Sequence, residues 1–210
     1  MAAAPVVRSF APILSSSSRA LILGSMPGVA SLRAAEYYAH PRNGFWPIVQ
    51  ELIGVDAAAH YHTRVEALRT HGYALWDVAG ICARPGSLDA DIDDDSVVPN
   101  DVAGLLRAHP SIARVCLNGG KAAALFRKHI APRLGDLAVD VRTLPSTSPA
   151  HAARSLAEKR ALWHAALAHL ELPAGSRVTM QSGDAPRVVP GAERRAAREG
   201  IKGVAGVVRS

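Results

Sequence analysis

The chain is poor in the features that mark several large protein classes. Its 210 residues include only two cysteines, Cys82 and Cys116, which is too few for a disulfide framework or a four-cysteine metal or iron–sulfur site. No apolar run approaches the roughly 18 residues that a membrane-spanning helix needs. The first residues lack the charged start and long apolar run of a secretory signal. We therefore expect a cytoplasmic protein that does not enter membranes.

Acidic residues are fewer than basic ones. The chain has 18 Asp and Glu against 24 Lys and Arg, a formal net charge of +6, and such a surplus fits a polyanionic partner such as nucleic acid. Much of it lies in residues 173–210, which are rich in Gly, Pro and Ser and which we interpret as a disordered basic tail. We divide the remainder into an N-terminal extension, residues 1–19, and one domain, residues 20–172.

Short apolar segments in the domain alternate with helical patterns. Four segments end in loops rich in Gly, Pro or Ser, and they span residues 20–23, 72–78, 114–117 and 139–144. Helices are expected between them, at residues 45–53, 65–71, 100–109, 121–129 and 150–170. This alternation predicts an α/β fold with a parallel sheet covered on both faces. The four loops then meet at the carboxyl edge of the sheet, where such folds bind ligands.

The first of these loops, Gly24-Ser25-Met26-Pro27-Gly28, follows a strand in the manner of a phosphate-binding loop. It lacks the Gly-Lys-Ser/Thr ending of a P-loop and the glycine spacing of a dinucleotide site. A nucleotide-binding enzyme of the doubly wound class is therefore disfavoured.

A second segment, Glu36 to Trp46, crowds aromatic rings, a His, an Arg and an Asn into a loop before a helix. Aromatic rings offer stacking faces for a nucleic-acid base, and an Asn side chain both donates and accepts hydrogen bonds. We assign Phe45 to the core and expect functional roles for Tyr38 and Asn43. The structural alternatives are that Tyr38 packs beneath the loop and that Asn43 caps the following helix.

Three strings together, residues 24–27, 37–46 and 144–150, resemble the uracil-DNA glycosylase superfamily. The deoxyinosine (hypoxanthine) branch is the most similar, and the mismatch-specific uracil and thymine enzymes are also similar. The resemblance covers about residues 21–170. It implies a three-layer α/β/α sandwich around a four-stranded, mostly parallel sheet. It also implies hydrolysis of the bond between a damaged base and deoxyribose, without metal or cofactor.

The resemblance also suggests which residues form the base pocket. Asn43 would orient a water against the sugar carbon, and Tyr38 would stack on the flipped base. Asp77 would read the base, or would instead cap a loop. Ser25 and Met26 belong to the first motif beside the base, with Ser25 also a candidate phosphate ligand. Met26 stands where uracil enzymes carry Asp, Asn or Glu, which puts efficient uracil excision in doubt.

The DNA backbone would be held by the last motif and by one lysine. Hydroxyls and backbone N–H groups at a helix start bind phosphate well, which favours Ser146 and Ser148. Pro149 and His151 would lie at the tip of a wedge that enters the gap left by the flipped base. Lys121, after Asn118-Gly119-Gly120, would meet a phosphate. The structural alternatives are a Ser/Thr helix cap and a solvated lysine.

An acidic run, Asp89 to Asp95, lacks the spacing of a calcium loop and is expected to decorate a surface loop. The sequence thus predicts a monomeric, monofunctional DNA repair glycosylase for deaminated bases, hypoxanthine first and uracil or xanthine next. With Lys121 on phosphate, we expect no strand nicking. The alternative is a lesion-sensing DNA-binding module without hydrolysis, which would not need Asn43.

Overall fold

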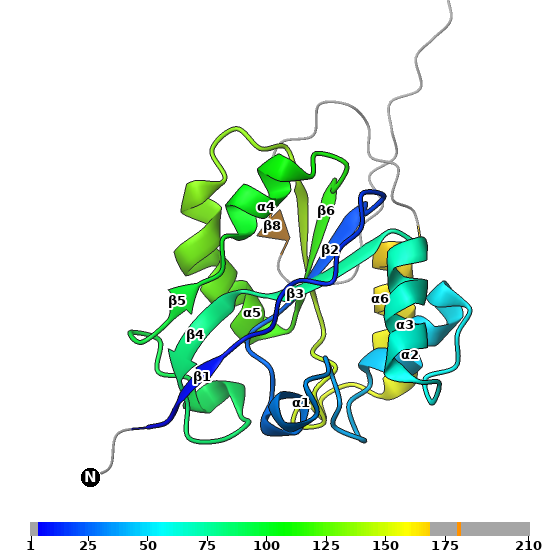
Figure 1. The fold of residues 1–210 in the computed structure, drawn as a ribbon, viewed down its shortest axis with the longest axis horizontal. Coiled ribbons are helices and arrows are strands. Elements are labelled where there is room, and N and C mark those ends of the chain that lie inside the picture. Colours follow the sequence, from blue (N-terminus) through cyan, green and yellow to red (C-terminus); the bar gives the residue numbers. More distant parts are fainter. Residues whose placement is uncertain (1–3, 169–179, 182–210) are drawn as a thin grey trace, which may run out of the picture.

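The computed structural model describes residues 4–168 and the two-residue strand at 180–181 (Figure 1). Its main sheet has the strand order β3-β2-β6-β7-β8, and every neighbouring pair is parallel. The strands are β2 (Ala20–Gly24), β3 (Tyr73–Asp77), β6 (Arg114–Asn118), β7 (Asp140–Leu144) and β8 (Met180–Gln181). The four expected strands and their parallel arrangement are confirmed, and β8 extends one edge.

Burial on both faces explains the apolar runs of the central strands. All five residues of β2 and all five of β6 are buried. Successive side chains of a strand point to opposite faces, so Leu21 and Leu23 belong to one core cluster while Ala20 and Ile22 belong to another. Each cluster needs a helical cover, which produces the three layers.

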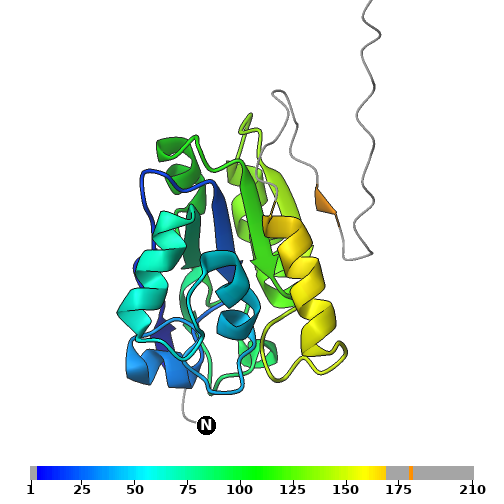
Figure 2. The ribbon, with the colours of Figure 1, turned by 90° about the vertical axis from the view of Figure 1, so that its right-hand side faces the viewer.

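The helices divide between the two faces of the sheet. Helices α4 (Val102–Ala108) and α5 (Gly120–Leu125) cover one face, together with the π-helical turn η2 (Phe126–Ile130) and the 3-10 turn η3 (Ala131–Arg133). Figure 2 shows the other face, covered by three helices, namely α2 (Phe45–Ile53), α3 (Tyr61–Thr70) and α6 (Leu156–Leu167). A short helix, α1 (Val29–Ala34), lies near the carboxyl edge of the sheet (Figure 1).

Helix α6 begins six residues later than the expected residue 150. Ser155 and Glu158 form a capping box there: Ser155 Oγ accepts from Glu158 N at 3.3 Å, and Glu158 Oε2 accepts from Ser155 N at 2.7 Å. This reciprocal capping fixes the helix start. The preceding residues, 145–155, therefore form a loop at the sheet edge.

A second, antiparallel sheet was not expected. It has the order β1-β4-β5 and consists of β1 (Val6–Arg8), β4 (Ala79–Ala83) and β5 (Val98–Pro99), with a 3-10 turn, η1 (Asp89–Asp91), between the last two. The expected N-terminal extension thus contributes β1 to the structure. It also contributes the buried Ile13, whose backbone exchanges 2.9 Å hydrogen bonds with Leu75.

Apart from β8, the expected basic tail at 173–210 lies outside the described residues. Among the helices that are described, none has the length and apolar character needed to cross a membrane.

Candidate active site

The predicted site residues lie on loops at one edge of the main sheet. Strands β2, β3, β6 and β7 are parallel and in register, with Gly24 opposite Asp77 and Asn118 opposite Leu144. Their carboxyl ends therefore meet, at the lower edge in Figure 1. The residues predicted to read the base, position the water and bind DNA lie at or next to this edge.

Asp77 and Tyr38 converge on Gly24. A Cβ atom on Gly24 would lie 2.4 Å from Asp77 Oδ1 and 3.4 Å from Tyr38 Oη, so only a glycine leaves room for this approach. Asp77 is 3% exposed, and its Oδ2 accepts from Ser9 Oγ at 2.8 Å. The Asp77 carboxylate accepts no backbone N–H from a described residue, so its side chain does not act as a loop cap.

The environment of Asp77 changes its protonation. The pKa of Asp77 is raised to about 7. Burial is the main cause and the nearby Asp89 carboxylate adds to it, whereas the hydrogen bond from Ser9 and the charge of Arg84 oppose the shift. A carboxyl group with this pKa exists in both forms near neutrality. It can donate a hydrogen bond to a base as the acid and accept one as the carboxylate.

The Tyr38 ring is fixed by its packing. Its φ of 56° places it in the left-handed region, and its ring stacks on Phe45 with centroids 4.1 Å apart. Its hydroxyl oxygen accepts from Asn118 Nδ2 at 3.0 Å, which leaves the hydroxyl proton for another acceptor. Burial raises the pKa of the Tyr38 hydroxyl far above its ordinary value, followed by the effect of Asp77. Tyr38 is therefore a neutral, positioned ring with one face against Phe45.

Asn118 and Thr147 join three loops and were missed as site residues in the sequence. Asn118 Nδ2 donates to Thr147 Oγ1 at 2.9 Å, and Asn118 Oδ1 accepts from Thr147 N at 2.9 Å. Thr147 O in turn accepts from Gly44 N at 2.9 Å. The end of β6, the 145–155 loop and the loop before α2 are thus one hydrogen-bonded unit that also holds Tyr38.

Asn43 is half-buried in the turn that leads into α2. Its Oδ1 accepts from Phe45 N at 3.0 Å, which closes a local turn. The N-cap of α2 is Gly44 and has no side-chain cap hydrogen bond, so a helix cap by Asn43 is not formed. A carbonyl oxygen has a second lone pair, and Asn43 Nδ2 donates to no described residue. The hydrogen bond to Phe45 N therefore orients the amide and leaves part of its hydrogen-bonding capacity available.

The first motif is held by residues for which the sequence predicted no role at the site. Ser25 Oγ donates to Asp89 Oδ1 at 2.5 Å. Arg84, 1% exposed, donates to Met26 O at 3.4 Å and also to Pro27 O. Asp89 is only partly exposed, so it does not simply decorate a surface loop as expected. The Met26 side chain is buried in the core cluster that contains Leu23.

The candidate phosphate ligands differ in their availability. Lys121 Nζ is paired with Asp94 Oδ1 at 2.6 Å, so this lysine already has a counter-ion. Ser146 Oγ accepts from Ser148 N at 3.2 Å, and Ser148 Oγ accepts from Ala150 N at 3.3 Å. In both serines the hydroxyl proton remains available to a phosphate oxygen.

The predicted wedge is exposed at its tip and anchored at its base. Pro149 and His151 are exposed, while Lys159 is buried and its Nζ donates to His151 O at 2.6 Å. Burial lowers the pKa of Lys159. The lysine thus fixes the backbone of the 145–155 loop from beneath.

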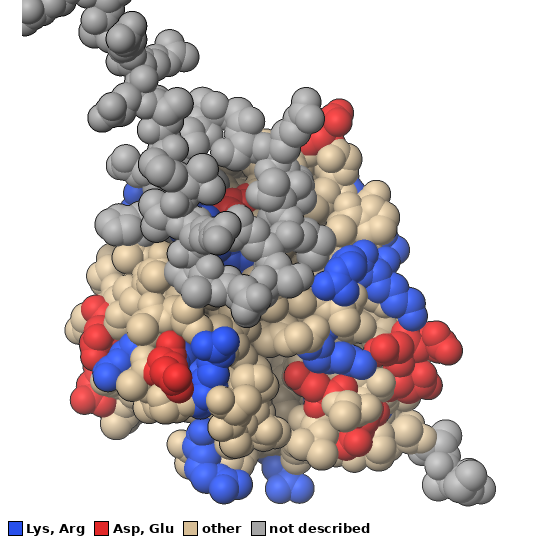
Figure 3. Space-filling view, turned by 180° about the vertical axis from the view of Figure 1, so that it is seen from behind, with Lys and Arg blue, Asp and Glu red and all other residues tan. Residues whose placement is uncertain are grey.

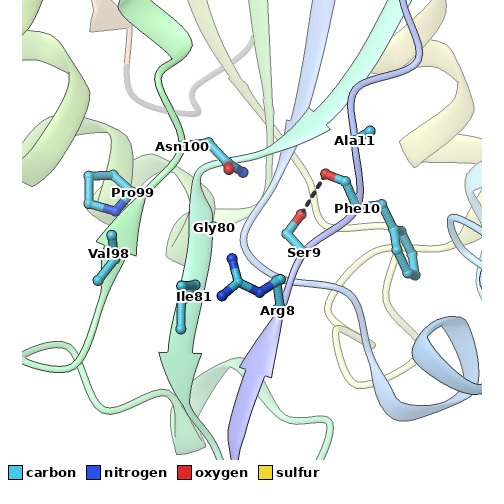
Figure 4. A pocket seen from close by; sticks show the side chains of 9 residues that line it. All are labelled: Arg8, Ser9, Phe10, Ala11, Gly80, Ile81, Val98, Pro99 and Asn100. Carbon is cyan, nitrogen blue, oxygen red and sulfur yellow. Dashed lines mark hydrogen bonds between the residues drawn. The ribbon is translucent and has the colours of Figure 1, made fainter.

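A cavity of about 270 Å³ adjoins this site, between β1, β4 and β5 (Figure 4). Arg8, Ser9 and Asn100 are among its lining residues. Ser9 donates to the Asp77 carboxylate, and Asn100 Nδ2 donates to Asp77 O at 2.9 Å. The cavity wall therefore supports Asp77 from the side of the second sheet.

The chain is similar in sequence and fold to known proteins. Residues 11–171 match the family model of the uracil DNA glycosylase superfamily. A hypoxanthine DNA glycosylase of Methanosarcina acetivorans is 32% identical over 165 residues, which cover 78% of this chain and 99% of the relative. A hypoxanthine DNA glycosylase of Methanosarcina barkeri is 33% identical over 157 residues, with 74% and 94% covered.

A solved structure agrees with these relatives. The solution NMR structure of a Methanosarcina acetivorans protein, provisionally assigned as a uracil DNA glycosylase, has a TM-score of 0.64 and 31% identity and covers 79% of this chain and 99% of its own. The fold and the matches define a DNA glycosylase, a hydrolase that acts on N-glycosyl bonds. The chain belongs to the uracil DNA glycosylase superfamily.

Proposed function

We propose that the protein hydrolyses the N-glycosidic bond of a flipped deaminated base in DNA, hypoxanthine first and uracil or xanthine next, and leaves an abasic site. The two named relatives support hypoxanthine as the first substrate. A base within a duplex cannot reach a side chain at the sheet edge, so the nucleotide must be flipped out at a cost of a few kcal/mol. The observation that carries the proposal is the oriented Asn43 amide beside the unit that holds Tyr38.

Asn43 positions the attacking water in this proposal. Phe45 N fixes the orientation of the amide, and the second lone pair of Asn43 Oδ1 accepts a hydrogen bond from the water. An amide is too weak a base to take the proton near neutrality. The rate enhancement then comes from positioning the water at the sugar carbon and from electrostatic stabilisation of an oxocarbenium-like sugar.

The other pocket residues recognise the base. Tyr38 offers its remaining face for stacking, with Phe45 behind it. Asp77 reads an edge of the base, and its pKa of about 7 lets it act as donor or acceptor. Met26 contributes apolar packing beneath the first loop.

The DNA backbone is bound by the 145–155 loop. Ser146 and Ser148 donate their free hydroxyl protons to phosphates, and Pro149 and His151 enter the gap left by the flipped base. Lys121 reaches a phosphate only by exchanging Asp94 for it. The protein acts as a monomer, in a reducing cytoplasm that keeps its two buried cysteines as free thiols.

The enzyme is monofunctional in this proposal. A lyase step needs an unprotonated amine near the sugar carbon. Lys121 is held by Asp94, and Lys159 Nζ is directed to His151 O beneath the loop. Neither lysine is therefore assigned to the sugar, and we expect no strand cleavage to accompany base release.

A substrate panel tests the function. Duplexes with one inosine, uracil or xanthine opposite each normal base are incubated with the protein and then treated with alkali. Alkali-labile sites at inosine, with intact strands before treatment, are the expected result. The hydrogen bond from Phe45 N to Asn43 Oδ1 favours one alternative, a non-catalytic lesion-sensing module, because it gives Asn43 a structural reason to be present. Binding to these duplexes without any alkali-labile product would support that alternative.

A further inference from the structure

Segment 84–89, which follows β4, holds the loop between β2 and α1 through side chains. Arg84 donates to the carbonyl oxygens of Met26, at 3.4 Å, and Pro27. At the other end of the loop, Ser87 Oγ accepts from Val29 N at 2.9 Å. The contact nearest the sheet edge is the 2.5 Å hydrogen bond from Ser25 Oγ to Asp89 Oδ1.

Charge strengthens the Ser25–Asp89 contact. The Arg84 guanidinium is buried, and its Nε has no hydrogen-bond partner among the described residues. Burial raises the pKa of Asp89, whereas the hydrogen bond from Ser25 and the charges of Arg84 and Lys121 favour its ionised form. A carboxylate accepts hydrogen bonds and cannot donate them. The single proton of the Ser25 hydroxyl is therefore directed to Asp89.

The direction of this hydrogen bond decides what Ser25 can bind. Because the Ser25 hydroxyl donates its hydrogen bond to Asp89, Ser25 Oγ can only accept a hydrogen bond from a ligand. Phosphate oxygens are acceptors, so Ser25 is unsuited to a backbone phosphate. The residue directly follows Gly24, on which Asp77 and Tyr38 converge, and it is therefore next to the proposed base pocket.

An acceptor at this position matches the chemistry of deamination. Ring N1 of adenine and ring N3 of cytosine are acceptors, whereas the corresponding nitrogens of hypoxanthine and uracil carry a proton. A hydrogen-bond acceptor thus accepts hypoxanthine or uracil and leaves adenine or cytosine with two opposed lone pairs, which is strongly disfavoured in a buried site.

We propose that Asp89 is a positioning residue and Ser25 a specificity-determining residue of the site. Asp89 accepts the hydrogen bond of the Ser25 hydroxyl and so fixes Ser25 Oγ as the acceptor for the ring N–H of hypoxanthine or uracil. This inference rests on the proposed function and adds the group that recognises the lactam N–H. It keeps Ser25 in the base pocket and removes it from the candidate phosphate ligands.

The test compares two bases in wild type and variants. Duplexes carry either inosine, with its N1–H, or 2′-deoxynebularine, whose purine N1 has no proton. For each protein, kcat/KM is measured on both duplexes, and the ratio of the value for inosine to the value for nebularine is compared. This ratio cancels any general loss of activity, so a merely structural effect of a substitution leaves it unchanged.

The variants are Ser25→Ala, Asp89→Ala, their double variant and Asp89→Asn. We expect each alanine variant to lower the ratio about tenfold, as for loss of one good hydrogen bond. The double variant should lower it no further, because the two side chains act as one unit. The amide oxygen in Asp89→Asn can still accept a hydrogen bond from the Ser25 hydroxyl, so this variant should keep most of the wild-type ratio. Asp91→Asn, an exposed carboxylate in the same turn, is the matched control and should match wild type.

Unchanged ratios in Ser25→Ala and Asp89→Ala, or multiplying effects in the double variant, would overturn the proposal. The affinities of each protein for the inosine and nebularine duplexes are also measured by fluorescence anisotropy, and their ratio is compared in the same way. If wild type releases no base from either duplex, the proposed function fails and the affinity ratio alone decides whether Ser25 and Asp89 read the N–H. An equal affinity of wild type for both duplexes would then reject that role as well.

Discussion

Gly24 lies opposite Asp77 in the parallel pair of β2 and β3, so close that a Cβ atom on Gly24 would come within 2.4 Å of Asp77 Oδ1. The main-chain register of the sheet therefore sets the position of a titratable side chain at the ligand edge. The absence of a side chain at residue 24 is as much a part of the site as the carboxyl group itself.

Gly24→Ala tests this relationship. The methyl group must displace the buried Asp77 carboxyl, and overpacking of this kind destabilises a protein by about 1–3 kcal/mol. We expect thermal unfolding to remain cooperative at a lower Tm, with base release from an inosine duplex reduced at least tenfold. Gly28→Ala is the control, since a Cβ there meets its nearest atom at 3.7 Å. Equal activities of the two variants would contradict the assignment.

The pKa of about 7 for Asp77 predicts a pH dependence of stability. The value is raised above that of an unfolded aspartate, about 3.9. The protonated form therefore contributes stability in full below about pH 4, and this contribution is lost as the pH rises through 7. Asp77→Asn removes the titration. Its Tm relative to wild type should rise between pH 5 and pH 8 in thermal unfolding scans, and a constant difference would show that Asp77 is ionised throughout.

The Asn118–Thr147 unit predicts different costs for its two members. Asn118→Ala leaves the backbone N–H of Thr147 buried without its acceptor, at a cost of about 1–3 kcal/mol. Thr147→Val removes only the hydroxyl partner and should cost less, about 1 kcal/mol. Chemical denaturation measures both. Because Asn118 also donates to Tyr38 Oη, Asn118→Ala alone should weaken binding of a duplex that carries inosine.

Exposed arginines on α1 and on the loops of the ligand edge predict the salt dependence of DNA binding. Arg33, Arg42 and Arg154 are exposed and form no ion pair within the described part of the chain, and positive side chains project from the lower edge in Figure 3. Each phosphate contact contributes about 0.9 to the slope of log affinity against log salt. Arg42→Ala and Arg154→Ala should each reduce that slope by this amount.

Arg127→Ala is the matched control for these arginines. It removes the same charge from η2, which follows α5 toward the opposite end of the sheet. An equal loss of slope in Arg127→Ala would show that DNA responds to net charge alone and does not contact the ligand edge.

Four strands of the main sheet could be predicted from sequence because they are short, largely apolar segments that lead into loops rich in Gly, Pro or Ser. Strands β1 and β5 could not be predicted, because segments of three and two residues are too short to show an alternating hydrophobic pattern. They are defined only by their pairing with β4. The start of α6 was predicted six residues too early, because apolar periodicity outweighed the Ser155–Glu158 capping box that ends the loop.

The position of the candidate site residues at one edge could be predicted where the sequence signal is local. Tyr38, Asn43 and Asp77 stand in one short string or at one strand end, and the structure brings their elements to the same edge. Ser25 and Asp89 are 64 residues apart, and no local pattern connects them. Asn118 could have been predicted as a site residue, because it is a polar residue at the end of a buried strand. The nearby Lys121 instead led to a prediction of phosphate binding for this loop.

Asn43 is best tested by single-turnover release of hypoxanthine from an inosine duplex. Asn43→Ala removes the amide and the acceptor of Phe45 N, with a cost of about 1 kcal/mol in stability. Asn43→Ser keeps a short acceptor for Phe45 N and serves as the folded control. We expect both variants to bind the duplex within a few-fold of wild type and to release base slower by about 100-fold or more. Release at the wild-type rate by Asn43→Ser would contradict the assignment of the amide to the attacking water.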